Sequence, residues 1–193
     1  TLAVDIGNSS TSVGIYTTSA GGPVLGLHTA LPTRLLRHRE LTRESLPASL
    51  LDSSEIDTIG IASVVPWATD ELIEVLHAQF PSARVVVVTM SMISLGFGYP
   101  HPEELGVDRI VGALAGHRLW SSGRDVIVID MGTATTVDCV TASGTFLGGV
   151  IMPGVELAAS ALSQKAVQLP AIELAFPNSL IGRTTVESMQ SGI

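Results

Sequence analysis

The sequence predicts an α/β protein in which one structural unit occurs twice. Asp, one further residue, Gly and then a run of small polar residues appear at 5–12 and again at 130–136. Each copy follows an apolar run of β type and leads into another, which predicts two strand–turn–strand units. Strand-like and helix-like segments alternate along the rest of the chain, and this alternation is typical of α/β architecture.

The individual elements follow from local patterns. Residues 58–65 form an apolar run that ends at Pro66, which indicates a buried strand. We expect Thr69 to cap a helix, because two acidic residues follow it and apolar residues from Leu72 onward recur on one helical face. The other expected elements are strands at 24–29 and 85–89, helices at 33–51 and 109–120, strands starting at 126 and 137 and covering 146–152, and helices at 154–165 and from 184.

Two domains are expected, at 1–120 and 125–193. Residues 121–124 read Ser-Ser-Gly-Arg, a composition typical of a linker between domains. The second domain is the shorter, and it starts a helix near residue 184 that no strand follows. We therefore expect the second domain to be incomplete.

Composition excludes several classes of protein. The chain has 193 residues with a formal net charge of −8, so a broad basic surface for nucleic acid is not expected. No apolar run is long enough to span a membrane. A single cysteine, Cys139, leaves no internal disulfide and fits a reducing cytoplasm. Lys165 is the only lysine and no glycine precedes it, so a P-loop of the G-x-x-x-x-G-K-[ST] type is absent.

The repeated turns favour a nucleotide site. Glycine lets backbone N–H groups approach a phosphate closely, and hydroxyl and amide side chains add further donors. An aspartate at the end of a strand supplies the hard oxygen ligand that a cation accompanying phosphates prefers. One Asp-x-Gly turn alone is also an ordinary turn. Two copies in two halves indicate a cleft that binds a nucleoside triphosphate from both sides.

Residues 99–109 join the two halves and contain a second candidate functional site. Asp108 lies at or beside a helix start, so it is either an N-cap or a carboxylate presented to a substrate, with Arg109 beside it to bind an anionic group. Residues 148–154 form another glycine-rich turn, for which close packing and anion binding are equally good explanations.

Together these motifs resemble the type III pantothenate kinase family. The resemblance is carried by residues 5–9, 99–109, 130–136 and 148–154, and it extends to 182–185 and 190–192. The motifs occur in the family's order over nearly the whole chain. Membership implies duplicated ribonuclease-H-like domains of the actin and sugar-kinase type, with a cleft between them and a truncated second domain. It also implies transfer of a phosphoryl group from ATP to pantothenate, the first step of coenzyme A synthesis.

The resemblance also implies a role for each matched residue. Asp108 is expected to be the proton acceptor, Asp5 to lie near Mg²⁺, and Asp130 to bind a monovalent cation, K⁺ or NH₄⁺. The expected ATP contacts are Asp5, Ile6, Gly7, Asn8, Ser9, Ser10, Thr11, Ser12 and Thr133. The expected pantothenate contacts are Tyr99, Gly106, Val107, Asp108, Arg109 and Thr185.

The resemblance to this family further implies a homodimer.

Two alternatives to the pantothenate kinase function stay open: a sugar or acetate kinase of the same fold, and a regulatory accessory protein. The acceptor loop at 99–109 disfavours the first, and retention of the three aspartates disfavours the second.

Overall fold

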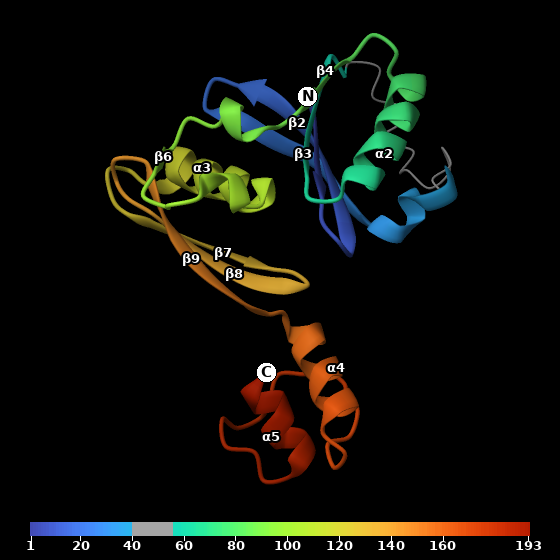
Figure 1. Ribbon diagram of the computed structural model, residues 1–193, viewed down its shortest axis with the longest axis vertical. Helices are drawn as coiled ribbons and strands as arrows, with labels where there is room; N and C mark the ends of the chain where they lie inside the picture. The colour runs from blue at the N-terminus through green and yellow to red at the C-terminus, as the bar shows by residue number, and fades with distance from the viewer. Residues whose placement is uncertain (40–55) are drawn as a thin grey trace. The chain divides into compact units, whose positions relative to one another are not determined.

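The computed structural model describes residues 1–39 and 56–193 (Figure 1). The chain forms two compact units. The first comprises Thr1–Leu95 and Pro100–Ala115, and the second comprises Gly96–Tyr99 and Gly116–Ile193. The division falls within one helix, and each unit is described by itself. The domain bounds expected from the sequence, 1–120 and 125–193, stay a prediction.

The first unit is a five-stranded mixed sheet in the order β3-β2-β1-β4-β5. β1 is antiparallel to β2 and parallel to β4, with Val4 opposite Val13 on one side and Ile61 on the other. Its strands are β1 Leu2–Ile6, β2 Ser10–Ser19, β3 Gly22–Pro32, β4 Thr58–Ser63 and β5 Arg84–Val87; its helices are η1 Thr33–Arg39, α2 Pro66–Gln79, η3 Met90–Met92 and η4 Pro102–Glu104. Of the helix expected at 33–51, only η1 lies within the described residues.

The core of the first unit forms where β1 meets α2. Leu2, Val4 and Ile6 alternate along β1 and are at most 4% exposed. They belong to one apolar cluster with Leu72 and Leu76 of α2. Side chains that alternate on a strand share one face of the sheet, so an amphipathic helix can cover all three. This packing fixes the end of β1, where the first Asp-x-Gly turn begins.

Two expectations about this unit were wrong in detail. Thr69 does not cap α2: the helix begins at Pro66, and the buried Thr69 hydroxyl donates to the carbonyl of Val65 at 3.2 Å. Proline suits the first turn of a helix because its missing N–H has no intrahelical partner there. The strand expected at 85–89 runs from Arg84 to Val87, and its side chains are half-buried or exposed, because β5 is an edge strand.

The second unit is a four-stranded sheet in the order β6-β9-β8-β7. Its buried face is centred on Phe146, which is 0% exposed and which the rings of Phe97 and Tyr99 contact at centroid distances of 6.5 and 6.3 Å. Its elements are β6 Gly96–Phe97, β7 Val126–Met131, β8 Ala134–Val140, β9 Thr145–Pro153, α4 Val155–Lys165 and α5 Thr185–Gly192, and α3 Val107–Trp120 begins in the first unit and ends in this one. The predicted α/β class with a repeated strand–turn–strand unit is thus confirmed.

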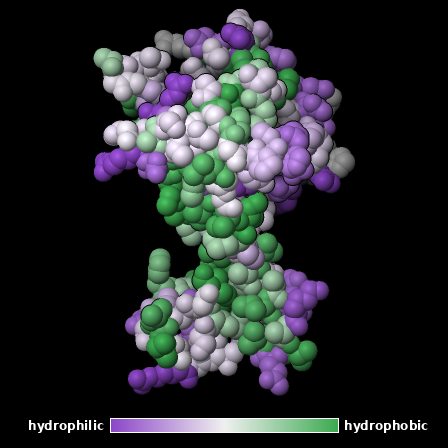
Figure 2. Space-filling model, turned by 60° about the vertical axis from the view of Figure 1, so that its left-hand side comes forward, coloured by the Kyte–Doolittle hydropathy of each residue, from purple (hydrophilic) through white to green (hydrophobic). Residues whose placement is uncertain are grey.

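The opposite face of the second sheet is apolar and exposed. Ile127, Ile129 and Met131 of β7 are 64%, 61% and 70% exposed, although they occupy the positions that Leu2, Val4 and Ile6 hold in the first repeat. Each strand pairs with the strand that follows it, Val4 with Val13 and Ile129 with Val137, so the second hairpin is one residue shorter than the first. Figure 2 shows hydrophobic surface gathered over these strands. The sequence pattern alone predicts similar burial for both strands, and only the structure shows that β1 is buried and β7 exposed.

α5 begins with a regular cap. The Thr184 hydroxyl accepts a hydrogen bond from the N–H of Glu187 at 3.1 Å, and the Glu187 carboxylate accepts one from the N–H of Arg183 at 2.7 Å. The first of these bonds satisfies a backbone donor that the first helical turn leaves without a partner, and the second holds the residue before the cap. In the described ranges, 1–39 and 56–193, no helix is both long and apolar enough to cross a membrane.

Candidate functional site

The first Asp-x-Gly turn connects β1 to β2 and presents polar groups to solvent. Asp5 and residues 8–10 are exposed, whereas Ile6 between them is fully buried. The N–H of Gly7 donates to the carbonyl of Ser10 at 2.9 Å and closes the turn. An added Cβ on Gly7 would lie 3.1 Å from that carbonyl oxygen, so glycine suits this position. The turn therefore has an exposed carboxylate next to a tight run of amides and hydroxyls.

A buried pair of threonines supports this turn from inside. Thr11 and Thr33 are both 0% exposed, and their hydroxyl oxygens are 3.0 Å apart. The Thr33 hydroxyl donates to the carbonyl of Gly7 at 2.7 Å, and the Thr33 N–H donates to the carbonyl of Ser9 at 2.9 Å. Thr11 was expected to contact ATP, but its side chain faces the interior. Sequence analysis missed Thr33, because no local pattern shows that η1 folds back beneath the turn.

The second Asp-x-Gly turn is one residue shorter than the first, because Gly132 donates its N–H to the residue two positions on, whereas Gly7 donates to the residue three positions on. The N–H of Gly132 donates to the carbonyl of Ala134 at 2.9 Å, and Asp130 and Thr133 are exposed. Gly154, which precedes α4, donates its N–H to the carbonyl of Thr133 at 2.9 Å. A Cβ on Gly154 would overlap the carbonyl oxygens of Gly132 and Thr133. The structure therefore gives this glycine a packing role, one of the two explanations that the sequence left open.

The acceptor loop ends at the start of α3. Gly106 directly precedes the helix, whose first residue is Val107, so Asp108 lies in the first turn and is not the N-cap residue. Asp108 is half-buried, and its Oδ1 accepts a hydrogen bond from the N–H of Arg109 at 2.8 Å. A Cβ on Gly106 would overlap this same oxygen. The absence of a side chain at 106 thus makes room for the carboxylate.

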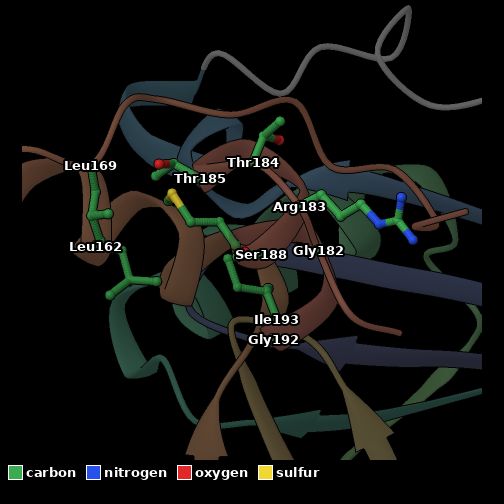
Figure 3. Close-up of a pocket in the computed structure, with 10 residues that line it drawn as sticks. Leu162, Leu169, Gly182, Arg183, Thr184, Thr185, Ser188, Gly192 and Ile193 are labelled. Carbon is green, nitrogen blue, oxygen red and sulfur yellow. The ribbon is translucent and has the colours of Figure 1, made fainter. Parts of the chain in front are cut away.

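Two further predicted substrate residues lie in the second unit. Tyr99 is half-buried and packs edge-on against Phe146, and its ring would lie 3.4 Å from a Cβ added to Gly148. Thr185 begins α5 and lines a pocket of about 640 Å³ between α4 and α5. Figure 3 shows Leu162 on the α4 side of this pocket, with Arg183 extending away from it.

The predicted site residues are therefore distributed over both units. The first unit holds the turn at 5–12 and the loop at 106–109, and the second holds Tyr99, Asp130, Thr133 and Thr185. Among the described residues, no group of three or more His, Cys, Asp or Glu side chains is arranged to hold a metal. An Mg²⁺ ion that keeps several waters and binds substrate phosphates needs only one or two protein carboxylates. The carboxylate of Asp5, at the first Asp-x-Gly turn, is therefore a suitable ligand for such an ion.

Fold and turns define a class: an α/β protein with a repeated strand–turn–strand unit, whose two Asp-x-Gly turns suit a nucleotide. The model of the family described as type III pantothenate kinase matches residues 1–193, and the chain belongs to that family. The family and the enzyme class predicted from the motifs are thereby confirmed.

Relatives named type III pantothenate kinase agree with this match. The protein from Anaeromyxobacter sp. (strain K) is 34% identical over 196 residues, which cover 100% of this chain and 75% of the relative. The protein from Frankia casuarinae is 37% identical over 199 residues, covering 100% and 74%. A crystal structure from Campylobacter jejuni, described as a Baf family transcriptional activator, aligns with a TM-score of 0.58 at 20% identity, covers 100% of this chain and 73% of its own, and shows the shared fold.

Proposed function

We propose that this protein transfers the γ-phosphoryl group of ATP to the primary hydroxyl of pantothenate, with Asp108 as the general base. Family membership over residues 1–193 supports the overall reaction. For Asp108, the supporting observation is local: a half-buried carboxylate is fixed at a helix start by the Arg109 N–H, next to a glycine that leaves room for it. A positioned carboxylate of this kind can accept a proton from a substrate hydroxyl.

The two Asp-x-Gly turns are assigned to the nucleotide. Backbone N–H groups and hydroxyls in each turn stabilise charge on phosphate oxygens, and Asp5 is placed to hold the accompanying Mg²⁺. Bound Mg²⁺ neutralises charge that develops on the transferred group. Asp130, exposed at the end of β7, is assigned to a monovalent cation, K⁺ or NH₄⁺. We also propose that the protein acts as a homodimer in the cytoplasm.

Pantothenate is a carboxylate, so its binding calls for a cation. Arg109 directly follows Asp108 and is half-buried at the same helix start. A guanidinium group can bind a carboxylate through two parallel hydrogen bonds, which also fixes its orientation. We assign Arg109 to this contact, and we propose that Tyr99, Gly106, Val107 and Thr185 also contact pantothenate.

A coupled assay of ADP release tests the reaction. Pantothenate, a panel of sugars and acetate are offered as acceptors to the same preparation. Turnover with pantothenate alone supports the proposal, and turnover with a sugar or acetate instead assigns the protein to the rival kinase class. Absence of turnover with every acceptor, together with retained ATP binding, favours the accessory-protein alternative.

A further inference from the structure

Thr33 is joined to the first Asp-x-Gly turn by two hydrogen bonds from a fully buried position. Its hydroxyl donates to the carbonyl of Gly7 and its N–H donates to the carbonyl of Ser9. A hydroxyl has a single proton to donate. Since Thr33 gives that proton to Gly7, Thr11 must be the donor in the 3.0 Å contact between the two threonines. The result is an ordered chain of hydrogen bonds from Thr11 through Thr33 to Gly7.

These bonds determine which way the peptide groups of the turn face. In a trans peptide the carbonyl and the following N–H point in opposite directions, and the described chain contains no cis peptide bond. Because the carbonyls of Gly7 and Ser9 point inward to Thr33, the N–H groups of Asn8 and Ser10 are directed the other way. Two N–H groups directed to one side of a tight turn form the kind of concavity that binds an anion.

The second repeat contains an equivalent of the hydrogen bond from the Thr33 N–H, but no equivalent of the hydrogen bond from the Thr33 hydroxyl. Pro32-Thr33 at the end of β3 corresponds to Pro153-Gly154 at the end of β9. Thr33 donates its N–H to Ser9 at 2.9 Å, and Gly154 donates its N–H to Thr133 at the same distance. At Gly154 a side chain would strike the Gly132 carbonyl, which corresponds to the Gly7 carbonyl that the Thr33 hydroxyl binds. The hydroxyl is therefore specific to the first turn.

We propose that Thr33 is a positioning residue for the nucleotide: it does not touch ATP, but its hydroxyl holds the Gly7 peptide so that the turn's N–H groups face the phosphates. This inference rests on the assignment of the first turn to ATP. It predicts a defect confined to the binding of ATP, because we assign no pantothenate contact to this turn.

Thr33→Val tests this role, since valine keeps the shape and the backbone N–H but loses the hydroxyl. We expect KM for ATP to rise about tenfold, the change that corresponds to losing one well-placed hydrogen bond, with KM for pantothenate within about twofold. Thr33→Ser keeps the hydroxyl, so its KM for ATP should stay within about threefold of the parent value. The matched control is Thr69→Val, because Thr69 is also buried in the first unit and its hydroxyl donates to the carbonyl of Val65, which lies outside both Asp-x-Gly turns. It should lower Tm similarly and leave both KM values unchanged.

Equal rises in both KM values, a nucleotide defect in Thr69→Val, or no rescue by Thr33→Ser would overturn the inference and make Thr33 a residue of general stability. If Thr33→Val does not fold, Thr33→Cys, with a weaker donor, is judged by the same criteria. Asp5→Asn is measured in parallel. A higher KM for ATP in Asp5→Asn but not in Thr33→Val rejects only the role of Thr33. An unchanged KM for ATP in both variants rejects the assignment of the turn to ATP itself.

Discussion

Gly106→Ala is expected to lower kcat by about 10- to 100-fold without unfolding the enzyme. The new methyl group would overlap Asp108 Oδ1, while its other neighbours, such as Val64 Cγ1 at 3.6 Å, lie at ordinary contact distance. The carboxylate can rotate away, because it is the end of a short side chain. Rotation breaks the 2.8 Å hydrogen bond with the Arg109 N–H, which contributes about 1 kcal/mol to stability. Tm should therefore fall only slightly.

The catalytic effect of this rotation should be much larger. Displacing a catalytic group by about 1 Å is enough to lower turnover about 100-fold, so kcat should fall by about 10- to 100-fold. Steady-state assay of ADP release gives kcat, and thermal unfolding gives Tm for the same preparation. Gly60→Ala is the matched control, because a Cβ at Gly60 meets nothing within 4 Å. Its kcat should stay close to that of the parent protein.

A double-mutant comparison identifies the group responsible. If Gly106→Ala acts by moving Asp108, it should cost little further activity in an Asp108→Asn background, because residues that act together are not additive. Full activity in Gly106→Ala, with Tm equal to that of Gly60→Ala, would refute the coupling between this glycine and the carboxylate. A full additional loss in the double variant would show that Gly106 acts through another group.

Three further predictions follow from the proposed site. Asp108→Asn should fold normally and lose about 100-fold or more in kcat, because the amide cannot accept the proton; parent-like turnover would leave Asp108 only its hydrogen bond within the helix. Asp130→Asn should abolish any stimulation by K⁺ or NH₄⁺ over Na⁺ in the ADP-release assay, and equal parent rates in all three salts would contradict the cation assignment. Arg109→Lys should raise KM for pantothenate more than KM for ATP, since an ammonium group cannot form the two parallel hydrogen bonds; a defect confined to ATP would move Arg109 to the phosphate site.

The sequence carried enough information for the class of fold and for the two turns. Asp-x-Gly followed by small polar residues has a direct physical meaning at the end of a strand, and it occurs at both Asp5 and Asp130. The start of α2 was misplaced, because acidic residues after Thr69 imitate a helix N-terminus, while Pro66 was taken as the end of a strand. The sequence contained two signals for the start of this helix, the acidic residues after Thr69 and the proline at 66, and the proline marks the observed start.

Other features depend on contacts between distant segments, which local patterns cannot show. Thr33 supports a turn more than twenty residues away, a relation set by the pairing of β2 with β3. The role of Gly106 likewise depends on the rotamer of Asp108. Exposure of β7 is the clearest case: its pattern resembles that of β1, but β1 lies between β2 and β4 and packs against α2, whereas β7 is an edge strand with an exposed apolar face.

The open edge of β7 gives Asp130 a second role, in aggregation of the protein. β7 is six residues long, lies at the edge of its sheet, and Asp130 is its only charged residue. Uncharged β-branched segments on an open edge pair readily with copies of themselves, and a single charge interrupts such pairing. Asp130→Asn should therefore increase aggregation at high protein concentration, in addition to any effect on a cation. Asp130→Glu keeps the charge but moves the carboxylate, so it should alter the response to K⁺ while the protein stays dispersed.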